Sequence, residues 1–106
     1  MLNKDLLMMG GAEELWTLQL NFTGDSYIDL ILWDSTDQSH ILWEGNPKTD
    51  IVTIRIPPKS TLLLTQSLGL YRVITEDGCT AEDYARREIA ITVNQSEAYL
   101  EVLFGS

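Results

Sequence analysis

The feature that most constrains the fold of this chain is an alternation of apolar and polar residues with a period of two. Between positions 15 and 22, every second side chain is large and apolar: Trp16, Leu18, Leu20 and Phe22. The same alternation returns at positions 51–56, where the apolar members are Val52, Ile54 and Ile56. Because successive side chains of a strand point to opposite faces, this pattern predicts half-buried β-strands.

Turn-forming residues separate these segments. Gly24-Asp25 and Gly45-Asn46-Pro47 are turns by composition, and Pro57-Pro58 ends a strand because proline cannot donate to a ladder. The strands are expected at 15–22, 27–33, 40–44, 51–56, 61–65, 70–75, 89–93 and 99–104. Short strands at this spacing predict an all-β fold, an antiparallel β-sandwich (jelly-roll or Ig-like) of about seven to eight strands. We expect residues 15–106 to form it as a single domain.

Two pairs of neighbouring strands are predicted to form hairpins. The sequence Ile-Leu-Trp followed by an acid occurs at 31–34 and again at 41–44, which favours pairing of those two segments. Segments 61–65 and 70–75 flank a short connection at 66–69, and we predict a second hairpin there.

One short helix is predicted near 80–88. Thr80 followed by Asp83 resembles a capping box, and Ala81, Tyr84 and Ala85 share one face of such a helix. Acidic residues lead the segment and Arg86-Arg87 end it, as the helix dipole favours.

The segment 27–33 is apolar on both faces except at Asp29. Two expectations stay open for it. The strand is central and covered on both sides, or one of its faces is covered by another subunit.

Charge and cysteine content restrict the partners and the setting. The net charge is −9, with nine acidic and two basic residues in positions 1–50. Such a chain repels phosphate, so no direct nucleic-acid binding is expected. No stretch has the length of a membrane span, and the apolar run before Gly10 is too short for a signal peptide. With Cys79 as its single cysteine, the chain is expected in the cytoplasm or in a virion assembled there.

Residues 1–14 are predicted to form a flexible N-terminal arm. Five large apolar residues lie in it and form a candidate contact for oligomerisation or assembly: Leu2, Leu6, Leu7, Met8 and Met9. Since leaving such side chains in water is unfavourable, we expect the arm to dock on its own domain or on a neighbouring copy.

The residues that catalysis and metal binding require are scarce. One histidine, His40, and one cysteine stand outside any nucleophile motif, so we predict no enzyme, no cofactor and no metal site. Calcium is the remaining metal hypothesis, because oxygen ligands are available from Asp25, Asp29, Asp34 and Asp37.

Aromatic residues of the first half form a candidate binding site. Rings on a sandwich stack on sugars while neighbouring polar side chains bond hydroxyl groups, and the residues suited to this are Tyr27, Trp33, Trp43, Asp34 and Asp37. The alternative location for tryptophan is the core, which we favour for Trp16 and for at least one of Trp33 and Trp43.

Three functions remain open. The first is a non-catalytic structural or assembly protein that forms a homo-oligomer, such as a trimer, in the manner of a small phage or virion accessory protein (capsid decoration or tail-associated). The second is a carbohydrate-binding module. The third is an acidic inhibitor or nucleic-acid mimic, suggested by the charge of the first half.

Overall fold

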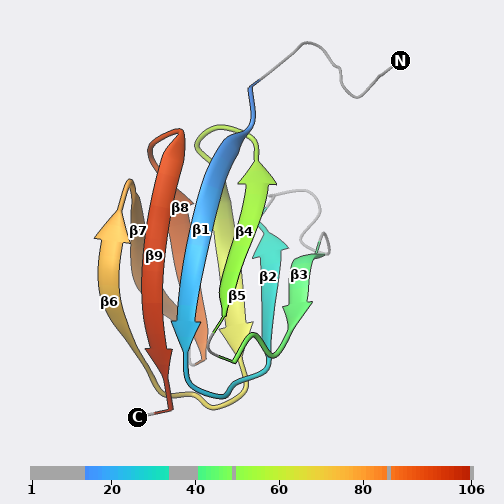
Figure 1. Ribbon diagram of the computed structural model, residues 1–106, viewed down its shortest axis with the longest axis vertical. Helices are drawn as coiled ribbons and strands as arrows, with labels where there is room; N and C mark the ends of the chain where they lie inside the picture. The colour runs from blue at the N-terminus through green and yellow to red at the C-terminus, as the bar shows by residue number, and fades with distance from the viewer. Residues whose placement is uncertain (1–13, 34–40, 49, 86, 106) are drawn as a thin grey trace.

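The computed structural model describes residues 14–33, 41–48, 50–85 and 87–105. This part of the chain forms nine strands (Figure 1), namely β1 (Trp16–Thr23), β2 (Ile28–Leu32), β3 (Ile41–Gly45), β4 (Ile51–Ile56), β5 (Thr61–Gln66), β6 (Tyr71–Asp77), β7 (Cys79–Ala85), β8 (Glu88–Val93) and β9 (Glu97–Phe104). The predicted arm at 1–14 lies almost wholly outside the described residues.

The strands build two sheets that face each other, which confirms the all-β sandwich. One sheet has four strands in the order β4-β1-β9-β6, and the other has five in the order β3-β2-β5-β8-β7. Figure 1 shows the four-stranded sheet in front of the other. The predicted antiparallel pairing holds for every strand pair of the described chain except β1 and β9, which run parallel.

The first predicted hairpin is confirmed and the second is wrong. β2 pairs with β3, with Leu30 opposite Trp43. In contrast, β5 pairs with β2 and β8, whereas β6 belongs to the other sheet and pairs with β9. The connection between β5 and β6 therefore crosses from one sheet to the other. The alternation of apolar and polar residues within a strand shows which face is buried, but it does not show which strand pairs with it.

The predicted helix near 80–88 is also wrong, because this segment is strand β7 and the turn to β8. Cys79 is buried and Ala81 packs against the core, whereas Thr80 and Glu82 are exposed. The pairing of β7 with β8 satisfies the backbone and buries the cysteine. A two-turn helix has little stability of its own, so tertiary pairing overrides its capping residues.

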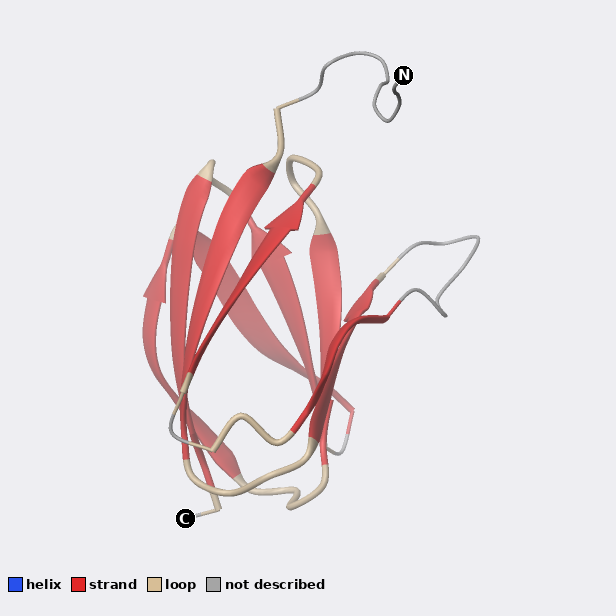
Figure 2. Ribbon diagram, turned by 45° about the vertical axis from the view of Figure 1, so that its right-hand side comes forward, coloured by secondary structure: helices blue, strands red, loops and turns tan. Residues whose placement is uncertain are grey.

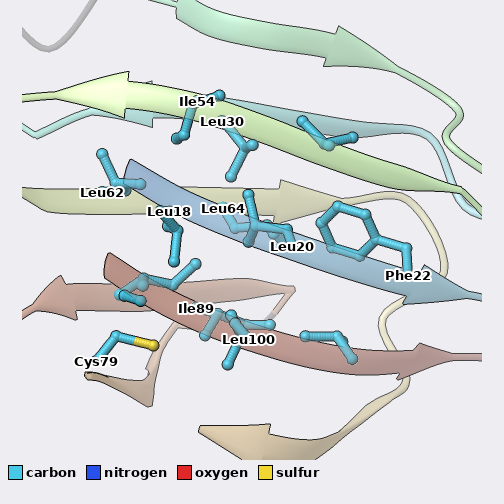
Figure 3. Close-up of a cluster of buried hydrophobic side chains, with 14 of the residues drawn as sticks. Leu18, Leu20, Phe22, Leu30, Ile54, Leu62, Leu64, Cys79, Ile89 and Leu100 are labelled. Atoms are coloured by element: carbon cyan, nitrogen blue, oxygen red, sulfur yellow. The ribbon is translucent and has the colours of Figure 1, made fainter. Parts of the chain in front are cut away.

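A single hydrophobic core fills the space between the sheets. Figure 3 shows side chains of both sheets pointing into it, among them Leu18 and Leu100 from the four-stranded sheet and Leu64 and Ile89 from the five-stranded sheet. These four residues have no exposed surface. The alternation found in the sequence therefore corresponds to the inner faces of the sheets.

Each side of the sandwich has two edge strands, one from each sheet. β3 and β4 lie on one side, and β6 and β7 lie on the other (Figures 1 and 2). Among the described residues, no helix has the length and hydropathy needed to cross a bilayer.

Candidate binding face on the five-stranded sheet

The outer face of the five-stranded sheet is the first candidate for a binding surface. Ile28 and Leu30 of β2 are buried between the sheets, so the alternate residues Asp29, Ile31 and Trp33 point outward. Within the described ranges of the chain, the two sheets pack on each other and no further element packs on this outer face. The described residues therefore cover one side only of the segment that is apolar on both faces.

A row of apolar side chains crosses the middle of this face. The strand register aligns Ile31 with Ile41 on β3 and with Leu63 on β5, and it aligns Leu63 with Ala90 on β8. We call these four residues the apolar row. Ile41 is 50% exposed, and the other three are partly exposed. On β7 the row ends at Glu82, opposite Ala90.

Two aromatic rings meet over the apolar row. The centroids of the Trp33 and Tyr84 rings lie 4.5 Å apart, and the planes form an angle of 84°. Trp33 follows β2 and Tyr84 belongs to β7, with β5 and β8 between them. The rings therefore lie across the two intervening strands, and Tyr84 is still 54% exposed.

An acidic row runs beside the apolar row. The register aligns Glu44 with Asp29, Asp29 with Thr65, and Thr65 with Glu88. We call these four residues the acidic row. The Oδ1 atom of Asp29 is buried and has no hydrogen-bond partner among the described residues. Carboxylates that face each other across a strand pair are unfavourable, so this row suits a partner that brings positive charge.

Tyr27 precedes β2 and contacts Glu44, the member of the acidic row on β3. Its hydroxyl donates to Glu44 Oε2 over 2.7 Å, and its side chain is 48% exposed. This hydrogen bond, with smaller effects of desolvation and of the charges on Glu44 and Asp29, raises the pKa of Tyr27 above its usual value. The neutral phenol is thereby held in place as a donor to the carboxylate.

The outer face of the four-stranded sheet provides the contrast. Its described outward residues on β1, β4 and β9 are mostly polar: Thr17, Gln19, Asn21, Thr53, Arg55, Tyr99 and Glu101. Tyr99 is bound there through its hydroxyl, which accepts a hydrogen bond from the Asn21 amide over 3.1 Å. An apolar row with a charged border thus distinguishes one face of the molecule from the other.

The structure places the predicted site residues in different surroundings. Tyr27 and Trp33 lie on the outer face. Trp43 lies opposite Leu30 and packs against the core, so it is separated from them by the sheet. Asp34 and Asp37, as well as Leu2, Leu6, Leu7, Met8 and Met9, lie outside the described residues.

The sequence did not predict that Tyr84, Leu63 and Ala90 belong to this candidate binding face. Tyr84 falls in the segment predicted as a helix, and Ala90 is too small to attract attention. The triplet Leu62-Leu63-Leu64 was the available signal, because an alternating strand requires its middle leucine to face away from the core.

Groups that support catalysis or metal binding are not assembled on the described part of the chain. No cluster of three or more His, Cys, Asp or Glu side chains suited to a metal ion occurs in it. Of the four aspartates suggested for calcium, Asp25 accepts a hydrogen bond from the Asn46 amide, and two lie outside the described residues. Cys79 is buried in the core.

Comparison with known proteins supports the fold. No protein-family model matches the chain, and no curated protein sequence matches it. Two solved structures, both of a bacterial adhesin from Mobiluncus mulieris containing intramolecular disulfide, isopeptide and ester bond cross-links, cover 88% of the chain with TM-scores of 0.57 and 0.60. Sequence identity is 12% and 14%, and the match spans 42% of each adhesin chain, so the likeness concerns the β-fold alone. With one cysteine, this chain has no second thiol for an intramolecular disulfide.

Proposed function

We propose that this chain is a non-catalytic assembly domain that docks on another protein through the outer face of its five-stranded sheet. The observation that carries the proposal is the apolar row with the Trp33 and Tyr84 rings above it, on a face that no other described element covers. Partly exposed apolar side chains that adjoin one another favour a protein interface.

The charge of this face determines the kind of partner. The apolar and acidic rows, together with Glu82, contain the acids Asp29, Glu44, Glu82 and Glu88 and no basic residue. A surface with lysine or arginine around an apolar centre would complement this arrangement and would associate faster at low salt. The repeated carboxylates and the net charge of −9 argue against two copies meeting at this face.

A non-catalytic role is supported by the inventory of reactive groups. The chain has one histidine and one cysteine, and the cysteine is buried. The fold shared with an adhesin is compatible with a role in binding. A homo-oligomer and a place in a phage or virion particle stay predictions from the sequence, to be tested separately by the mass of the particle in solution.

A carbohydrate-binding module is the second candidate, and Tyr27 favours it. Its half-exposed ring beside Glu44 offers a stacking surface next to a hydrogen-bond acceptor. The Trp33 and Tyr84 rings serve a sugar less well, because each covers part of the other.

Matched surface variants test the proposal. Ile31→Glu with Leu63→Glu disrupts the apolar row, and Gln19→Glu with Thr53→Glu adds the same charge to the other sheet. Proteins captured from the source cells by each form are identified, purified and titrated against the chain. We expect a complex that weakens with salt, that the first variant loses and that the second retains.

Two outcomes would overturn the proposal. One is a purified partner that binds both variants equally, or no partner that distinguishes them. The other is a glycan that binds the wild type and is lost on Tyr27→Ala, which would select the carbohydrate-binding module instead.

A further inference from the structure

A groove separates the two edge strands on one side of the sandwich. It has a volume of about 550 Å³ and is lined by residues from both sheets: Gly69, Leu70, Tyr71, Arg72, Val73, Asp83, Ala85 and Arg87. Figures 1 and 2 show β6 and β7 side by side at this edge of the molecule. The groove is therefore the opening between the sheets at this edge, whereas the apolar row lies on the outer face of the five-stranded sheet.

The backbone of β6 is available for pairing on this side. Among the described strands, β6 pairs with β9 alone. The Gly105 amide donates to the Leu70 carbonyl over 3.0 Å, which makes Leu70 and Gly105 a hydrogen-bonded pair. In an antiparallel ladder such pairs alternate, so the N–H and C=O groups of Tyr71 and Val73 point away from β9 and toward the groove.

A bulge limits the length of this available edge. The register of β6 on β9 shifts between Val73 and Thr75. Bulges interrupt pairing on edge strands, so a regular ladder extends only over Leu70–Val73. A segment that pairs there would be a short strand, and its alternate side chains would enter the opening beside Tyr71 and Ala85.

The groove has more positive than negative side chains, in contrast to the chain as a whole, whose net charge is −9. Its charged lining residues are Arg72, Arg87 and Asp83. The Arg87 side chain lies across Gly69, where a Cβ atom would stand 3.1 Å from Arg87 Nε. Gly69 thus makes room for the guanidinium at the end of the groove, and guanidinium groups favour carboxylates.

We propose that the groove between β6 and β7 binds an extended segment of another protein in which apolar and acidic residues alternate. The segment adds a short strand to β6, with its apolar side chains in the opening and its carboxylates at Arg72 and Arg87. Strand addition gives affinity through the backbone, and the two arginines select the sequence. This site is independent of the docking face proposed above.

Nuclear magnetic resonance titration of the ¹⁵N-labelled chain tests the site. The probes are a capped peptide of alternating valine and glutamate and a matched peptide of valine and lysine. We expect the glutamate peptide to shift the amide signals of Tyr71, Val73 and Ala85 in a saturable way. The amides of Tyr71 and Val73 should also exchange more slowly with solvent, because each gains a carbonyl acceptor.

Variants separate the contribution of the arginine charges to binding from the contribution of strand pairing. Arg87→Gly and Arg72→Gln should each weaken the glutamate peptide by about tenfold, the usual effect of losing one charge-assisted hydrogen bond. Arg55→Gln removes an exposed arginine on β4, at the opposite edge, and should change nothing. The lysine peptide should bind at least about tenfold more weakly than the glutamate peptide.

Several results would overturn the proposal. They are equal binding of the two peptides, shifts at the opposite edges β3 and β4 as large as those at β6, and no saturable binding. A peptide of residues 2–9 of this chain serves as a further probe. If it binds more tightly than the glutamate peptide, the occupant is a second copy and not an acidic segment of another protein.

Discussion

The Trp33 ring meets the Tyr84 ring edge to face at 4.5 Å, although β5 and β8 separate the strands that carry them. Side chains on one face of a sheet normally contact their neighbours on the adjacent strand. Here the two large side chains contact each other across β5 and β8, the strands that carry Leu63 and Ala90. The contact links the end of β2 to the edge strand β7.

The energy of this contact is measurable by a double-mutant cycle with Trp33→Leu and Tyr84→Leu. We expect a coupling free energy of about 0.5–1.5 kcal/mol, the range for aromatic pairs in contact. Urea denaturation followed by circular dichroism gives the four stabilities. Trp33→Leu combined with Tyr71→Leu on the other sheet is the control and should be additive. An additive Trp33 and Tyr84 pair would contradict the contact.

Tyr27 should ionise at higher pH than a free tyrosine. Its hydrogen bond to Glu44 raises the pKa of the phenol, so Glu44→Gln should return that pKa toward about 10. Alkaline titration of tyrosinate absorbance reports the four tyrosines together. The difference between wild type and Glu44→Gln isolates Tyr27.

Much of the fold could be predicted because burial imposes the period of two directly on the sequence. Every strand except β7 was located within two residues. The double apolar face of 27–33 also pointed to the outer face, and Ile31 and Trp33 lie on it. A strand face that packs in the core and a strand face that binds a partner are both apolar in sequence. The pattern therefore predicts the apolar surface but not what binds to it.

The rest depends on contacts between distant segments. The register that aligns Ile31, Leu63 and Ala90 is formed by three separate strands. Tyr84 was assigned to a helix because capping residues are local, whereas the pairing with β8 that makes it a strand residue is tertiary. The groove could not be predicted for the same reason. Tyr71 and Ala85 belong to different sheets, and they line one groove only because of the order of the strands in each sheet.

The thiol of Cys79 should be unreactive in the native protein. It is 6% exposed, and its Sγ donates to the Tyr99 carbonyl over 3.3 Å. Desolvation by burial is the main effect that raises its pKa; Glu76 and Asp77 add to it, while hydrogen bonds with the backbone oppose it. We expect modification by a thiol reagent to occur only at the rate of unfolding.

The same pKa shift makes stability depend on pH. The pKa of Cys79 is higher in the folded state, so its contribution is complete below the unfolded thiol pKa of about 8.5 and is lost as pH rises through the folded value. Cys79→Ala should therefore lose stability less steeply than wild type in urea denaturation above about pH 8.5. Parallel curves would contradict this account.

We expect Asp29 to contribute to the binding of a partner and not to the stability of the fold. It lies opposite Glu44, and its Oδ1 atom lacks a hydrogen-bond partner among the described residues. Asp29→Asn removes the repulsion, so we expect the free energy of unfolding to rise by about 0.5 kcal/mol. Thermal denaturation at low and high salt checks this, because the gain should shrink when salt screens the carboxylates. A loss of stability would show that Asp29 supports the sheet.

Arg87 provides the corresponding test for the groove. It adopts a φ of 70° in the turn between β7 and β8, a left-handed conformation that costs a non-glycine residue about 1 kcal/mol. Arg87→Gly relieves this strain, and we expect the free energy of unfolding to be unchanged or raised by up to about 1 kcal/mol.

Lys48→Gly and Lys59→Gly are the matched controls, because both lysines are exposed and have φ values of 56° and 61°. Urea denaturation compares the three variants. If the three variants gain the same free energy of unfolding, the Arg87 side chain contributes no more to folding than an exposed loop lysine does. Weaker binding of the glutamate peptide by Arg87→Gly would then be a loss of recognition by a stable fold. A loss of more than about 1 kcal/mol in Arg87→Gly alone would instead assign the arginine to the turn, through its packing on Gly69.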